Sequence, residues 1–123
     1  MTPEQFIYEN GEKKARDILS QYEKFIHVKK PTHFDTDLEI FIHEADFKTG
    51  KLDESDINLS HLKRLVESLD IIEKFGYDID GAKQLLDFCK SNKTITKSGI
   101  EITVERLKQA IEDHKAIYDK ADV

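Results

Sequence analysis

Tryptophan is absent from the 123 residues, cysteine and methionine occur once each, and proline occurs twice. A single cysteine cannot form an internal disulfide, so its scarcity favours a reducing compartment. We expect Cys89 to be a buried thiol, because it lies on the apolar face of a predicted helix. No apolar run approaches the roughly 18 residues that a membrane helix needs. The first residues, MTPEQF, lack the basic and then apolar layout of a signal peptide, which favours a cytoplasmic protein without membrane association.

The sequence also lacks the short motifs that carry enzyme or metal chemistry. It contains no HExxH, CxxC, GxSxG, P-loop or GxGxxG pattern. Its five histidines form no pair at metal-ligand spacing on one predicted helix. Residues 47–56 resemble the second half of a calcium-binding EF-hand loop, but Ala45 and Phe47 stand where early oxygen ligands belong. We therefore expect a protein that is not an enzyme, with no metal site and no cofactor.

Charge is plentiful and unevenly spread. Charged residues make up 36% and apolar residues 38%, which is typical of one modest core under a charged surface in a single domain of residues 1–123. The net charge is −6. Residues 35–56 contain eight acids against two lysines, whereas residues 83–97 contain four lysines against one acid. This separation either steers a binding partner or marks a solvated loop.

The clearest helical pattern lies between Leu62 and Phe75, where apolar residues recur every three or four positions. Gly76 is expected to end this helix in the left-handed conformation. A shorter helix with Ala82 and Cys89 on its apolar face follows, which gives an αα-hairpin over residues 58–90 in which each helix covers the apolar stripe of the other. Asn58 is a better helix cap than Ser60, because Ile57 and Leu62 can then form a hydrophobic staple.

Two further helices are predicted at the ends of the chain. Thr2 caps the first, with Pro3 at its first position and Gln5 completing a capping box. Gly11 predicts a kink or short turn in this helix, which should fade near His27. Thr103 caps a last helix, and a leftover apolar stripe on the first or last helix would allow a homodimer.

The spacing changes between Pro31 and Asp56. Leu38, Ile40 and Ile42 alternate with residues of other kinds, which predicts a short β-hairpin over about residues 37–53 with its turn at 48–51. Residues 91–94 indicate a loop, and residues 95–99 favour no particular element. The predicted fold class is mostly α with minor β: three to four helices built on the αα-hairpin 58–90, with one short β-hairpin.

The acidic segment is the favoured site for binding another macromolecule. Aromatic residues lie among its acids, and an aromatic anchor ringed by charge is typical of a protein interface. Either Phe41 is exposed as that anchor, or the phenylalanines pack onto the helices. The candidate partner-binding residues are Phe34, Asp35, Asp37, Glu39, Phe41, Glu44, Asp46 and Phe47.

Nucleic acid is a less favoured partner. The two helices around Gly76 resemble a helix-turn-helix in layout, and the second helix would then read DNA. Phosphate contacts need clustered Lys or Arg, and the candidates are Lys83, Lys90, Lys93 and Lys97 in an acidic chain. A third hypothesis makes the acidic segment a mimic that occupies the DNA channel of an enzyme.

Three stretches of the sequence resemble a known group of proteins. TPEQFIYENGEKKARDIL, DINLSHLKRLVESLDIIEKFG and ERLKQAIEDHKAIY are similar to small accessory proteins encoded in the early region of lambdoid bacteriophages and enterobacterial prophages. The similarity covers about half of the chain, and it carries over no site residues. It implies a non-structural phage product that acts in the bacterial cytoplasm and binds and modulates a host protein, in some cases to blunt host defences.

Overall fold

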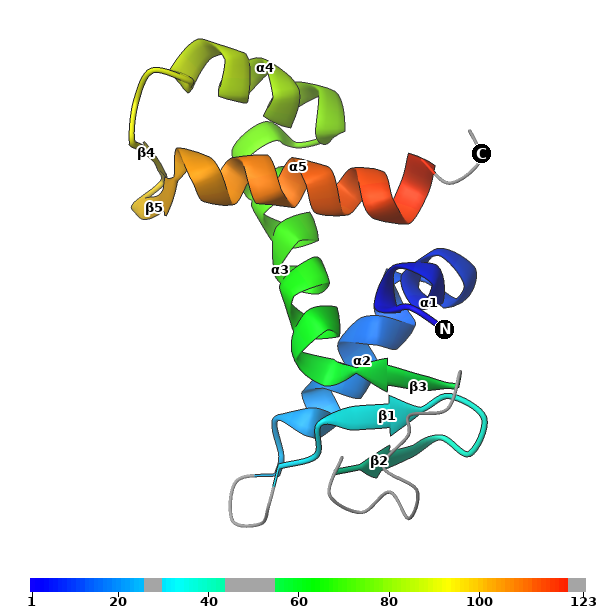
Figure 1. Cartoon of the computed structure of the whole chain (residues 1–123). Coiled ribbons are helices and arrows are strands. Elements are labelled where there is room, and N and C mark those ends of the chain that lie inside the picture. Colours follow the sequence, from blue (N-terminus) through cyan, green and yellow to red (C-terminus); the bar gives the residue numbers. More distant parts are fainter. Residues whose placement is uncertain (26–29, 44–54, 120–123) are drawn as a thin grey trace. The chain divides into compact units, whose positions relative to one another are not determined.

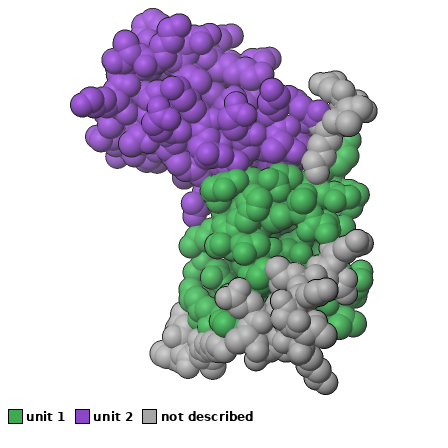
Figure 2. Space-filling model, in the orientation of Figure 1, with its two compact units in different colours: residues 1–66 green, residues 67–123 purple. Residues whose placement is uncertain are grey.

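The computed structural model describes residues 1–25, 30–43 and 55–119 (Figure 1). It divides into two compact units, residues 1–66 and residues 67–123, which are coloured separately in Figure 2. The predicted fold class is confirmed: the chain is mostly helical, with two small antiparallel sheets. That residues 1–123 form a single domain stays a prediction. The elements of the described residues are α1 (Pro3–Asn10), α2 (Glu12–Tyr22), β1 (His33–Asp35), β2 (Ile40–Ile42), β3 (Asp56–Asn58), α3 (Leu59–Gly76), α4 (Ile79–Cys89), β4 (Thr94–Lys97), β5 (Ile100–Thr103) and α5 (Val104–Tyr118).

The N-terminal unit begins with the predicted capped helix and its break. The Thr2 side chain accepts a hydrogen bond from the Gln5 backbone N–H at 3.1 Å. The Gln5 side chain donates to Glu9 at 3.2 Å, which is a different partner from the one a capping box requires. Gly11, at φ 90°, separates α1 from α2, which confirms the turn. The second helix ends at Tyr22, earlier than the predicted end near His27.

The sheet of this unit has the antiparallel strand order β2-β1-β3. Phe34 on the central strand lies opposite Phe41 on β2 and opposite Ile57 on β3. A β-hairpin is present, but it is not the predicted one: it joins 33–35 to 40–42, and Leu38, predicted in a strand, lies in its turn. The predicted turn at 48–51 lies outside the described residues, so the hairpin over 37–53 stays a prediction. Buried apolar residues of this unit are Phe6, Ile7, Ala15, Ile18, Leu19, Phe34, Ile57, Leu59, Leu62, Leu65 and Val66.

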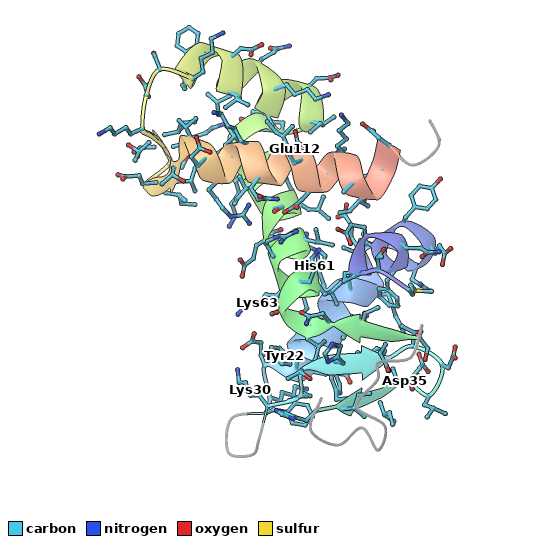
Figure 3. All side chains as sticks on the ribbon, in the orientation of Figure 1. Tyr22, Lys30, Asp35, His61, Lys63 and Glu112 are labelled. Carbon is cyan, nitrogen blue, oxygen red and sulfur yellow. The ribbon has the colours of Figure 1, made fainter. Side chains whose placement is uncertain are left out.

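The start of α3 belongs to the same unit. Asn58 accepts a hydrogen bond from the His61 backbone N–H at 2.8 Å and another from the Ser60 hydroxyl at 2.7 Å, which confirms Asn58 as the cap. On the first turns of α3, the His61 ring nitrogen lies 3.1 Å from a Glu4 carboxylate oxygen of α1 (Figure 3).

In the C-terminal unit, the turn between α3 and α4 differs from the expectation. Gly76 is the last residue of α3, and the left-handed residue is Tyr77, at φ 66°. Glycine is needed at 76 for space, since a Cβ atom there would overlap the Ala82 backbone nitrogen. The Asp78 side chain then caps α4 by accepting from the Gly81 N–H at 2.7 Å.

The helix α4 packs chiefly against α5 (Figure 1). The sequence had predicted that its apolar stripe would meet α3 instead. The two helices are consecutive, but they do not pack against each other as the predicted αα-hairpin, so that prediction was wrong. Ile72 and Phe75 of α3 lie in the core that α4 and α5 share. Cys89 lies half-buried at the edge of this core, less enclosed than predicted. The other buried core residues are Ala82, Ile95, Val104, Leu107, Ala110 and Ile111.

A second hairpin, β4–β5, occupies the stretch for which the sequence favoured no element. Ile95 lies opposite Ile102, and the connection consists of Ser98 (φ 53°) and Gly99 (φ 80°). Two successive residues at positive φ are typical of the tight turn whose twist matches antiparallel strands. Thr103 caps α5, as predicted, through a 3.0 Å hydrogen bond from the Arg106 N–H.

A buried polar cluster joins α3 to α5 within the C-terminal unit. The Ser68 hydroxyl donates to Asp113 at 2.6 Å, and Arg106 donates to the Ser68 hydroxyl at 3.0 Å. Gln109 donates to the second Asp113 oxygen at 2.9 Å. Because Asp113 is only 3% exposed, these bonds replace the water that the carboxylate loses on folding.

Candidate functional site

The loop between β1 and β2 is held in shape by one side chain. The Asp35 carboxylate accepts hydrogen bonds from the backbone N–H groups of Asp37 and Leu38, at 2.9 and 3.0 Å. Asp35 lies where β1 leads into the turn (Figure 3). Glu39 adopts a left-handed conformation at φ 55°, which returns the chain into β2. The side chain of Asp35 therefore fixes the backbone conformation of its own loop.

The loop presents apolar and acidic side chains to solvent in alternation. Leu38 is 68% exposed and Ile40 is 46% exposed. The exposed acids Asp37 and Glu39 lie beside them in the sequence. We call residues 37–40 the recognition loop. Single exposed apolar residues are common on proteins, and what distinguishes these two is that they lie two residues apart, at the turn and the start of β2.

Phe34 and Phe41, the two phenylalanines of the segment that the structure describes, pack inward. Phe34 is 5% exposed and belongs to the core. Phe41 is half-buried, and its ring makes edge-to-face contacts with Phe34 at 5.0 Å and Phe25 at 5.3 Å between centroids. These rings stabilise the sheet beneath the recognition loop, so the exposed apolar contact surface consists of Leu38 and Ile40. Neither was among the predicted site residues.

Of the predicted acidic site, the structure brings together Asp35, Asp37 and Glu39 on this one hairpin. Glu44, Asp46 and Phe47 lie outside the described residues. A neighbouring cavity of about 240 Å³ is lined by Lys14, Asp17, Ile18, Gln21, Phe34 and Glu39. The Lys14 ammonium lies 2.9 Å from a Glu39 carboxylate oxygen, an exposed ion pair that is worth little in stability.

The four lysines predicted as nucleic-acid contacts have different environments in the structure. Lys83 lies on α4 and Lys90 and Lys93 follow it, all with exposed side chains. Lys97 is engaged elsewhere: its ammonium donates to the Phe75 carbonyl at 3.3 Å and lies 4.6 Å from the centre of the Tyr77 ring.

One exposed side chain on α4 was missed by the sequence reasoning. Phe88 is 88% exposed, although it lies within the helix. The signal was present in the sequence, because Phe88 falls outside the apolar stripe that runs through Ala82 and Cys89. Helical periodicity singles out such a residue by its absence from the core face.

Side chains that could bind a metal ion can be placed only in the part of the chain that the structure describes. Within residues 1–25, 30–43 and 55–119, no group of three or more His, Cys, Asp or Glu side chains could hold a metal ion. The stretch that resembled an EF-hand loop lies almost wholly outside these ranges. None of the helices in the described part of the chain is long and apolar enough to cross a membrane.

The chain was compared with protein families, curated proteins and solved structures. No family model matches it, and neither the curated proteins nor the solved structures gave a match.

Proposed function

We propose that this chain is a small phage-encoded accessory protein that binds and modulates a host protein through the recognition loop. The observation that carries the proposal is the exposure of Leu38 and Ile40, which alternate with the exposed acids Asp37 and Glu39 on a hairpin. Apolar side chains at the centre of a contact with charge around them are the usual composition of a protein interface. The resemblance to phage accessory proteins supports the choice of a bacterial host protein as partner.

The way the loop is built supports this use. The hydrogen bonds of Asp35 and the packing of Phe34 limit the conformations of the loop before a partner arrives. A preorganised loop loses less conformational entropy on binding than a flexible one. Asp37 favours a partner surface that carries Lys or Arg around an apolar pocket, whereas the charge of Glu39 is already balanced by Lys14.

The test is affinity capture from nuclease-treated bacterial lysate, comparing the wild type with a Leu38→Glu, Ile40→Glu double variant. Both side chains are exposed, so the variant should fold normally, which circular dichroism checks. We expect a protein to be retained by the wild type after nuclease treatment and lost by the double variant. Tyr8→Glu is the control for introducing a glutamate elsewhere, since it replaces a large apolar side chain that is 51% exposed on α1 and adds one negative charge, half that of the double variant.

A third variant separates this proposal from mimicry of nucleic acid. Asp37→Asn with Glu39→Gln removes the charge of the recognition loop and leaves Asp35 to hold the turn. A mimic would lose its partner on this change, whereas the proposed contact should weaken only modestly because its centre is apolar. Capture that is indifferent to the Leu38 and Ile40 substitutions contradicts the proposal.

A further inference from the structure

A groove in the C-terminal unit lies between α3 and β5. Its volume is about 200 Å³, and its apolar lining consists of Ile71, Phe75, Ile100 and Ile102. Phe75 belongs to the buried core, whereas Ile71 and Ile102 are half-buried and Ile100 is 41% exposed. A cavity of about 150 Å³ can hold a benzene molecule, so this groove has room for an apolar side chain from another molecule. We call it the α3–β5 groove.

The rim of the α3–β5 groove carries charges of both signs in a fixed order along α3. The remaining lining residues are Glu67, Asp70 and Lys74. At about 100° per residue, Glu67 and Lys74 differ by only about 20° round the helix axis, and Ile71 lies about 40° from Glu67. Asp70 lies about 100° from Ile71, at the edge of this face. One face of α3 therefore presents an acid, an isoleucine and a base over two turns, with both charged side chains exposed.

This order of charges is complementary to itself when it is reversed. Glu67 and Lys74 lie about 5 Å on either side of their midpoint along the helix, which is beside Ile71. A second α3, antiparallel to the first about a twofold axis at that midpoint, brings Lys74 of each copy opposite Glu67 of the other. We infer that the α3–β5 groove binds the same groove of a second copy of this chain. The two Ile71 side chains meet at the axis, burial of Ile71 and Ile100 supplies the apolar centre, and the two ion pairs set the register.

The symmetry of the charges favours a second copy over a different partner. A twofold interface must place opposite charges at equal distances from its centre, and Glu67 and Lys74 satisfy that condition. A partner of uniform charge, such as a nucleic acid or a basic peptide, would be repelled by one of these two residues. The contact lies on α3 and β5, whereas the sequence indicated the first or last helix as the surface for a homodimer.

The dimer is expected to be weak. The groove has seven lining residues, whereas a standard interface has roughly 20 to 30 on each side, and the net charge of −6 on each chain opposes association. We expect a Kd on the order of 10 µM in about 150 mM NaCl, measured by sedimentation equilibrium of the full chain. A chain that stays monomeric up to about 500 µM overturns the inference.

Charge reversal tests whether the dimer uses this face. Glu67→Lys and Lys74→Glu each place like charges opposite each other at both ends of the contact, so each should weaken dimerisation by at least about tenfold. The double variant Glu67→Lys, Lys74→Glu restores both pairs with opposite polarity and should dimerise within about threefold of the wild type. Both side chains are exposed, so the variants should keep the fold, which circular dichroism checks.

Glu73→Lys is the matched control for Glu67→Lys. Glu73 is exposed on the same helix, about 160° from Ile71 round the axis, and its substitution changes the net charge equally. We expect dimerisation within about threefold of the wild type. A double variant as weak as the single reversals, or an equal effect of Glu73→Lys and Glu67→Lys, overturns the inference.

A disulfide cross-link tests the twofold axis directly. Cys89 is the only cysteine of the chain, so Cys89→Ser combined with Ile71→Cys leaves one thiol, beside the axis. A disulfide requires Cα atoms within about 7 Å of each other, which the two copies reach only near that axis. We expect oxidation to give a covalent dimer of the Ile71→Cys protein on a non-reducing gel, and much less of a Glu73→Cys protein in the same background. Equal yields for the two proteins, or no cross-link at Ile71→Cys, overturn the inference.

Discussion

Two polar contacts, one in each compact unit, hold the chain in different ways. In the β1–β2 turn, the partly exposed Asp35 accepts hydrogen bonds from two backbone N–H groups of its own loop. In the α3–α5 contact, the buried Asp113 accepts from Ser68, far away in sequence. Water can replace a lost partner at the first site and not at the second. The exposed turn can therefore lose a hydrogen-bond partner at little cost in stability, whereas the buried contact cannot.

The largest expected effect is at the buried contact. Asp113→Ala leaves the fully buried Ser68 hydroxyl without its acceptor, while water can replace the acceptor of the exposed Gln109 amide. We expect a loss of about 3 kcal/mol in the free energy of unfolding, measured by urea denaturation. Glu112→Ala is the matched control, since Glu112 is exposed on the same helix (Figure 3) and should change stability by less than about 0.5 kcal/mol. Equal losses in the free energy of unfolding for Asp113→Ala and Glu112→Ala would contradict the difference between the buried and the exposed contact.

A smaller effect is expected where two backbones approach closely. Gly76→Ala places a methyl group against the backbone of Ala82, and neither helix can yield without moving the other. We expect a loss of about 2 kcal/mol, seen as a lower urea midpoint. Gly99→Ala meets no atom and is strained only by its φ of 80°, so it should lose about 1 kcal/mol. A Gly76→Ala protein as stable as the wild type would contradict the close approach.

The smallest effect is expected in the exposed turn. Asp35→Ala removes both hydrogen bonds to the loop backbone, but water can satisfy the freed N–H groups. We expect a loss of about 1 kcal/mol together with faster hydrogen exchange at Asp37 and Leu38. Asp37→Ala, in the same loop, should change stability by less than about 0.5 kcal/mol. Unchanged exchange at Leu38 would show that Asp35 does not order the recognition loop.

Much of the fold followed from local pattern. The caps at Thr2, Asn58 and Thr103 were correctly predicted, because a cap depends on residues within one helical turn. The β4–β5 hairpin was missed although Ser98 and Gly99 are residues that favour such a turn. Its strands are four residues each, too short for alternation to stand out from a loop.

The candidate sites were predicted less well than the helices. The alternative of Phe41 as an exposed aromatic anchor was wrong, because its ring packs against Phe25 and Phe34, and the exposed apolar residues are Leu38 and Ile40. The acidic site stays a prediction, since Glu44 and Asp46 lie outside the described residues. A period of two residues indicates which side chains share a face of a strand, but it does not indicate which face the rest of the protein covers. For Phe88, helical periodicity indicated only that the side chain lies outside the apolar stripe of its helix.

The sequence by itself determined where the helices begin, which face of each is apolar, and how charge divides along the chain. These properties depend on neighbours within a few residues. The tertiary structure alone decided that α4 meets α5, that Gly76 must admit the backbone of Ala82, and that Ser68 pairs with Asp113. Each of these depends on which distant segments come into contact, and the free energy that selects those contacts is shared across the whole core.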